Sequence, residues 1–178
     1  MARSLAVISV AVVVVGLCAA RKTSVGSAAT ISGGCPATVA KRVANGSAVA
    51  PSSFNYGTGS LRAAIYWPHG TLTAGTLPQG GSMATINGDG SVSVKLGWWR
   101  GVPGSLIVIG WRLDGSAPPL GAEIPNGSYG SAGFIPSALT FPTPGCWRVI
   151  GQEGGVVGRR AHATLSLVVK VVKVKVSG

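Results

Sequence analysis

Acidic and imidazole side chains are scarce in this 178-residue chain. The side-chain carboxylates are Asp89, Asp114, Glu123 and Glu153. A Ser–His–Asp triad needs a base that is oriented by an acid, and no acid stands beside His69 or His162. No Gly-x-Ser-x-Gly elbow is present either. We therefore expect no catalytic residue and no enzyme activity. A hydrolase is the weakest alternative, and it would require one of the two histidines to meet a carboxylate in a cleft.

Ligands for a metal or a cofactor are equally few. The three cysteines and two histidines do not follow the spacing of zinc sites. A blue-copper site needs a Cys followed closely by His and Met, but the first His after Cys146 is His162 and no Met follows. No Gly-x-Gly-x-x-Gly motif opens a helix. We expect no metal and no cofactor.

The shortage of acids leaves a formal net charge of +11. The basic residues are spread along the chain without a dense run. One interpretation is attraction to an anionic partner such as a cell-wall polymer or lipid headgroups, and the other is a basic secreted protein whose charge serves solubility. Because basic clusters interleaved with aromatic residues are missing, we do not expect nucleic acid as a partner.

The N-terminus has the pattern of a secretory signal peptide. A positive start at Met1–Arg3 precedes the uncharged apolar run from Leu5 to Leu17, and small residues allow cleavage after Ala20. Alternatively, Cys18 is the lipid-modified first residue of a lipoprotein, although Leu17 precedes it where a small residue is usual. A second long apolar run is missing, which excludes a multi-span membrane protein. Both interpretations predict a secreted or envelope-associated protein, in contact with the membrane only through such a lipid.

Cleavage after Ala20 leaves Cys35 and Cys146. In an oxidising compartment such a pair predicts one disulfide, and two buried free thiols are the alternative. The bond would close a loop of about 110 residues, for which the chain-entropy model gives about 4–5 kcal/mol of stabilisation.

Turn residues and short alternating segments predict an all-β domain of about seven to nine strands. The chain holds 28 Gly and 11 Pro, and the segment 87–90 reads Asn-Gly-Asp-Gly. The strands that we expect most firmly are 61–67 with 71–76 as its partner, 91–96, 105–113 as a central strand, 146–152, and one within 161–176. The predicted organisation is a signal peptide at 1–20, a flexible lead-in at 21–34 and a β-sandwich domain at 35–178.

The five tryptophans suggest a core and one surface. Trp67, Trp111 and Trp147 lie in or beside apolar strands, and we expect them in the core. Trp98 and Trp99 are neighbours in a strand, so that one of them can face outward beside Arg100 and form a binding surface. In the alternative interpretation both anchor the packing.

Several motifs together resemble a group of exported bacterial proteins that is common among actinobacteria. They are Cys35-Pro36, Tyr56-Gly57-Thr58-Gly59 with Leu61, Trp98-Trp99-Arg100-Gly101, Arg112-Leu113-Asp114 with Ala117-Pro118-Pro119-Leu120, and Phe141-Pro142-Thr143 with Gly145-Cys146-Trp147. The resemblance implies an immunoglobulin-like antiparallel β-sandwich and export, often as a lipoprotein, but no activity. This chain departs from the pattern where an acid is expected, in the loop 126–133 and at Arg148.

The sequence thus predicts an exported, non-enzymatic immunoglobulin-like domain with a structural or binding role at the bacterial cell envelope. It does not specify the ligand. The alternative is a basic adhesion module that binds anionic envelope polymers or carbohydrate. The sequence does not identify the partner either, for which an anionic envelope polymer and another envelope protein are the candidates.

Overall fold

The computed structural model describes residues 34–40, 53–75, 84–127, 129–154 and 161–174. The predicted signal peptide with Cys18, and all of the lead-in except Gly34, lie outside the described residues. In the part of the chain that is described, no helix is long and apolar enough to cross a membrane.

The fold is all-β, as predicted. In chain order the elements are β1 (Tyr56–Thr58), β2 (Leu61–Ala63), the 3₁₀ helix η1 (Pro68–Gly70), β3 (Thr71–Ala74), β4 (Thr85–Ile86), β5 (Val92–Arg100), β6 (Leu106–Arg112), β7 (Gly121–Glu123), β8 (Gly133–Phe141), β9 (Gly145–Glu153) and β10 (Ala163–Lys173). The described residues therefore form ten strands, where seven to nine were expected. The surplus arises because strands of two or three residues, such as β4 and β7, are too short to show an alternation.

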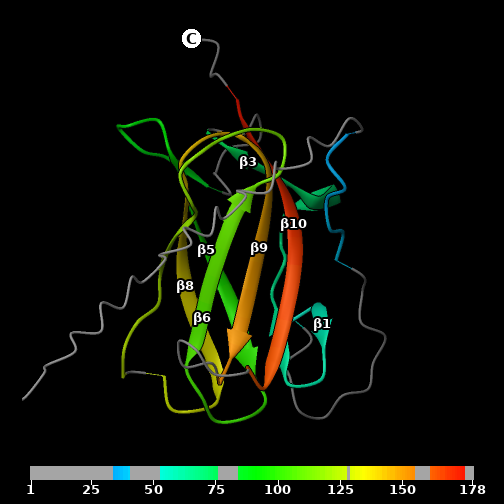
Figure 1. Ribbon diagram of the computed structural model, residues 1–178, viewed down its shortest axis with the longest axis vertical. Coiled ribbons are helices and arrows are strands. Elements are labelled where there is room, and N and C mark those ends of the chain that lie inside the picture. The colour runs from blue at the N-terminus through cyan, green and yellow to red at the C-terminus, as the bar shows by residue number, and fades with distance from the viewer. Residues whose placement is uncertain (1–33, 41–52, 76–83, 128, 155–160, 175–178) are drawn as a thin grey trace, which may run out of the picture.

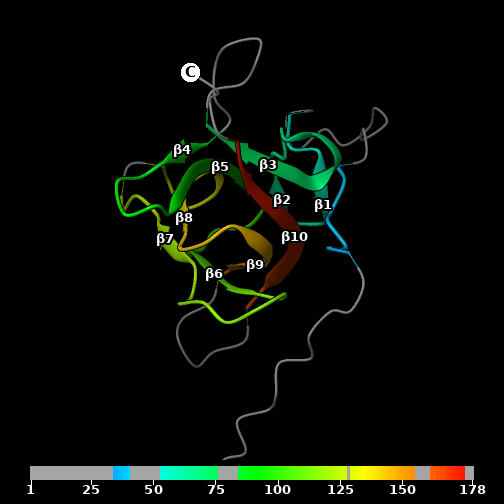
Figure 2. The same cartoon turned by 90° about the horizontal axis from the view of Figure 1, so that it is seen from above.

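The strands form two sheets that face each other (Figures 1 and 2). The first sheet has the order β1-β2-β5-β8-β7, with β4 also paired to β5, and the second has the order β3-β10-β9-β6. All pairs of strands are antiparallel except β3 with β10, which is parallel. The orders β2-β5-β8-β7 and β3-β10-β9-β6 correspond to the A-B-E-D and A′-G-F-C sheets of an immunoglobulin-like sandwich.

Alternating residues of the long strands build the core between the sheets. Val92, Val94 and Leu96 of β5 are buried, as the period-two pattern predicts. Trp98 continues this inward row, and its indole N–H donates to the Ser137 hydroxyl at 2.9 Å. The ring of Trp98 packs on the backbone of β9. A Cβ on Gly151 would lie 2.5 Å from that ring, and only glycine leaves the necessary space.

The end of β8, the turn after it and the start of β9 anchor the core at one end. Phe141 and Trp147 are fully buried, and their rings meet edge to face with 5.7 Å between centroids. The indole N–H of Trp147 donates to the Thr143 carbonyl at 2.9 Å. Cys146, which precedes Trp147, forms the predicted disulfide with Cys35, with 5.5 Å between the Cα atoms.

Two predictions about strand placement were wrong. Residues 71–74 pair with β10 in the second sheet and are not the partner of the segment 61–67, of which only β2 is a strand. The apolar strand 105–113 is not central, because β6 lies at an edge of the second sheet. Its apolar residues belong to both faces, and Trp111 is consequently 42% exposed, contrary to the core position predicted for it. Trp67 and Trp147 are buried as predicted.

Candidate binding site

The predicted surface at Trp98, Trp99 and Arg100 is divided between the two faces of β5. Trp98 is 0% exposed and Arg100 only 3%, so neither offers a surface to a ligand. Trp98 is thus the buried member of the tryptophan pair, which the sequence left open, and the prediction of a surface position was wrong for Arg100. The reason is the alternation of a strand, which turns both side chains toward the second sheet. Trp99 alone faces outward, and it is half-buried.

Trp99 belongs to a row of aromatic rings on the outer face of the first sheet. Its ring lies 5.8 Å from that of Phe54, which lies 6.1 Å from Phe134, which in turn lies 5.7 Å from Tyr129. Gly97 leaves room for the Phe134 ring to lie close to β5, because a Cβ there would come within 3.1 Å of that ring. Phe134 and Tyr129 remain 45% and 37% exposed, and they form the accessible end of the row.

Two adjoining pockets open around Tyr129. The larger, of about 490 Å³, extends over β7 and β8, and the smaller, of about 360 Å³, lies toward Arg100. They share the walls made by Ile124, Pro125 and Tyr129. The polar side chains at the larger pocket include Lys95 and Glu123. Both stand opposite Ala138 in the sheet register, one on each side of β8. A strip one strand wide, with a cation on one side and an anion on the other, thus lies beside the exposed rings.

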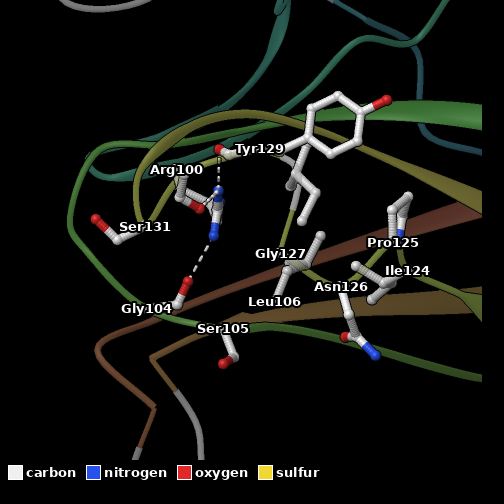
Figure 3. Close-up of a pocket in the computed structure, with 12 residues that line it drawn as sticks. Arg100, Gly104, Ser105, Leu106, Ile124, Pro125, Asn126, Gly127, Tyr129 and Ser131 are labelled. Atoms are coloured by element: carbon white, nitrogen blue, oxygen red, sulfur yellow. Dashed lines mark hydrogen bonds between the residues drawn. The ribbon is translucent and has the colours of Figure 1, made fainter.

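Arg100 holds the loop that carries Tyr129. One guanidinium nitrogen donates to the Gly104 carbonyl at 2.6 Å, and the other donates to the carbonyls of Tyr129 and Gly130 at 3.1 and 3.0 Å. In Figure 3 the guanidinium lies between these carbonyls, while the Tyr129 ring points away from it. A buried charge that satisfies three carbonyls fixes the backbone firmly. Arg100 is therefore a positioning residue for the loop that carries Tyr129.

Glu153 lies buried near the same end of the sandwich. Its carboxylate accepts a hydrogen bond from the Val102 backbone N–H at 3.3 Å and another from Ser60. Burial raises the pKa of Glu153 above its ordinary value of 4.5, and this effect exceeds the opposing effects of the two hydrogen bonds and of the positive charges on Arg100 and His162. A carboxyl with a raised pKa favours its protonated form in the folded state.

This raised pKa predicts a pH-dependent effect of Glu153→Gln. The folded wild type binds the proton more tightly, so Glu153 contributes stability that is present below its unfolded pKa and lost as pH rises through the folded pKa. We expect the variant to be more stable than wild type near neutral pH and equal to it near about pH 4. Urea unfolding at both pH values measures the difference. The lowered pKa values of Asp89 and Asp114 affect wild type and variant alike, so they do not change the difference in stability between the two proteins. A difference of equal size at the two pH values would contradict the prediction.

The histidines lie apart from the pockets. His69 occupies the turn of η1 with a left-handed φ of 51°. His162 precedes β10, and its backbone N–H donates to the Glu153 carbonyl at 2.8 Å. Within the described ranges, no three His, Cys, Asp or Glu side chains gather in a way that could hold a metal ion.

Sequence reasoning missed Tyr129, Phe134 and the two prolines that line the larger pocket, Pro125 and Pro136. A signal for Phe134 was present, because Ile135, Leu139 and Phe141 share one face of the strand and therefore place Phe134 and Pro136 on the other. Tyr129 carried no comparable signal, since it lies in a loop whose course depends on the buried Arg100.

Comparison with protein-family models, with curated proteins and with solved structures returns no match for this chain.

Proposed function

We propose that this protein is an exported, non-enzymatic binding domain of the bacterial cell envelope, and that its ligand lies against Phe134 and Tyr129. The observation that carries the proposal is the exposure of these two adjoining rings beside a pocket of about 490 Å³. Single exposed apolar side chains are ordinary on protein surfaces, whereas aromatic rings beside a pocket with a few polar groups are typical of binding sites.

The mixture of groups at this site favours carbohydrate as the ligand. A sugar ring has an apolar face of C–H groups, which can stack on Phe134, and a rim of hydroxyl groups. Glu123 can accept hydrogen bonds from such hydroxyls, and Lys95 can donate to them. Since neighbouring strands lie about 4.8 Å apart, the two side chains flank a strip of about 10 Å beside the exposed rings. An envelope glycan therefore fits the site.

The disulfide supports the proposed location. A bond between Cys35 and Cys146 suggests an oxidising environment outside the cytoplasm. The apolar N-terminal run followed by small residues supports export to the same compartment. An envelope glycan and this domain would then share one compartment.

The alternative, adhesion of a basic module to anionic envelope polymers, is favoured by the net charge of +11. The two functions differ in their response to salt. Contacts between exposed charges weaken as salt screens them, whereas stacking of an uncharged sugar on an aromatic ring is not weakened by this screening.

Phe134→Ala and Tyr129→Ala test the proposed site. We expect each to weaken binding to a lipid-free cell-wall fraction about 10-fold, as for loss of a central aromatic contact of about 1.4 kcal/mol or more. Binding isotherms of the purified protein measure the effect at low and high salt. Trp111→Ala is the matched control, because Trp111 is as exposed but lies on the other sheet.

Two results would count against the proposal. Equal binding by Phe134→Ala and wild type would show that the ligand does not lie against Phe134. Binding that disappears at high salt and is the same in all variants would favour the basic adhesion module.

A further inference from the structure

The outer face of the second sheet carries apolar and basic residues side by side. By the alternation of the strands, these are Ile109 and Trp111 of β6, Arg148 and Ile150 of β9, and Val168 and Lys170 of β10. Ile109 and Trp111 are 44% and 42% exposed, which is unusual for large apolar residues at the edge of a sheet. We call these six residues the second-sheet face.

The register of the sheet makes this face continuous. Trp111 stands opposite Arg148, and Arg148 stands opposite Val168, so these three residues form one row across three strands. Ile109 stands opposite Ile150 in the next row. The guanidinium carbon of Arg148 lies 5.8 Å from the centre of the Trp111 ring, in cation–π contact. The basic and the apolar groups are therefore parts of one surface.

Negative charge is missing from this face. Of the four side-chain carboxylates in the chain, Glu153 lies on β9 but points inward and is buried, and Glu123 belongs to the first sheet. Asp89 lies in the turn before β5, and Asp114 follows β6 and pairs with Arg112 at 2.7 Å. The exposed cations Arg148 and Lys170 are thus left without an acidic neighbour on the face.

Charge argues against a second copy of this chain stacked on this face. Such a dimer would bring the same cations together on a protein that already carries a net charge of +11. A hydrated anionic polymer would pair with the cations but would leave Ile109 and Trp111 facing water. An anionic bilayer surface accommodates both the apolar and the basic side chains, because tryptophan is favoured at the membrane interface and basic side chains are attracted to lipid phosphates.

We propose that the second-sheet face docks this domain on the surface of an anionic phospholipid bilayer. Trp111 and Ile109 enter the interfacial layer, and Arg148 and Lys170 contact the phosphates beside them. The face is on the opposite side of the sandwich from the Phe134 and Tyr129 rings, so the proposed glycan site would point away from the membrane. This inference does not depend on that site.

The test is binding of the full chain to phosphatidylglycerol-rich vesicles and to phosphatidylcholine vesicles. We expect an excess of binding to phosphatidylglycerol that disappears between about 0.1 M and about 1 M salt, as the Debye length falls from about 10 Å to about 3 Å. The apolar N-terminal segment is flanked by the cations Arg3, Arg21 and Lys22, so its insertion would also favour phosphatidylglycerol. Assignment of the binding to the second-sheet face therefore depends on the variants of that face.

Variants identify the residues. Arg148→Gln and Lys170→Gln should each lower the phosphatidylglycerol-dependent partition about fivefold, which corresponds to about 1 kcal/mol for each basic residue near an anionic surface. Lys95→Gln is the matched control, because Lys95 is an exposed cation on the opposite sheet and its loss should change the partition little. Brominated acyl chains should quench part of the tryptophan emission of wild type, and that part should be lost in Trp111→Phe.

Three results of the vesicle experiments would overturn the proposal. They are equal binding to both kinds of vesicle, an equal loss in Lys95→Gln and Arg148→Gln, and unchanged quenching in Trp111→Phe. Binding to a soluble anionic polymer without binding to vesicles would assign the face to such polymers instead, and would likewise overturn it.

Discussion

Replacement of both Cys35 and Cys146 by serine is expected to lower the free energy of unfolding by about 4–5 kcal/mol. The bond spans 111 residues, so its removal frees a long loop in the unfolded chain. The loss is a large part of the about 5–15 kcal/mol that stabilises a typical domain. Urea unfolding followed by tryptophan fluorescence measures it.

A matched control separates the bond from the cysteine side chains. Reduction of the wild type should give the same loss as the double substitution, whereas Cys18→Ser should leave the free energy of unfolding unchanged. A loss below about 1 kcal/mol in the double variant would show that the bond does not constrain the unfolded chain in the way the entropic model requires.

Trp98→Ala is expected to lower the free energy of unfolding by about 3–5 kcal/mol, the range for removal of a large buried ring. Trp98 is 0% exposed and joins the two sheets, with its N–H on Ser137 of the first and its ring on Gly151 of the second. Trp99→Ala should cost less, because Trp99 is only half-buried on the outer face.

The contact between Trp98 and Gly151 can be tested by a double-mutant cycle. Gly151→Ala alone should destabilise the protein by about 1–3 kcal/mol, because the added methyl group overlaps the indole ring. The same substitution should cost less in a Trp98→Leu background, where the ring is gone. Additive losses would mean that the two residues do not share one packing site.

The fold could be predicted wherever a single face of a strand is apolar. The alternation at Val92, Val94 and Leu96 gave the inward face of β5 correctly. The same reasoning failed for β6, because apolar residues on both faces indicate a central strand, whereas this strand lies at an edge. Position within a sheet depends on pairing with distant strands, and local periodicity carries little information about it.

Less of the candidate site could be predicted. The sequence singled out Trp98, Trp99 and Arg100, and only Trp99 lies on the outer face. The rings that are most exposed come from β8 and from a loop that the buried Arg100 holds in place. A loop fixed by contacts between residues about 30 positions apart has no local signature, and its exposed ring becomes visible only in three dimensions.

Hydrogen–deuterium exchange of the protein with and without bound cell-wall glycan fragments tests the central claim most directly. The proposed site predicts slower amide exchange in the segments 95–99 and 123–138, around Phe134 and Tyr129, with β6 and β10 unchanged. Slower exchange on β6, β9 and β10 alone, or no change anywhere at saturating glycan, would contradict the claim that this protein binds an envelope glycan through the outer face of its first sheet.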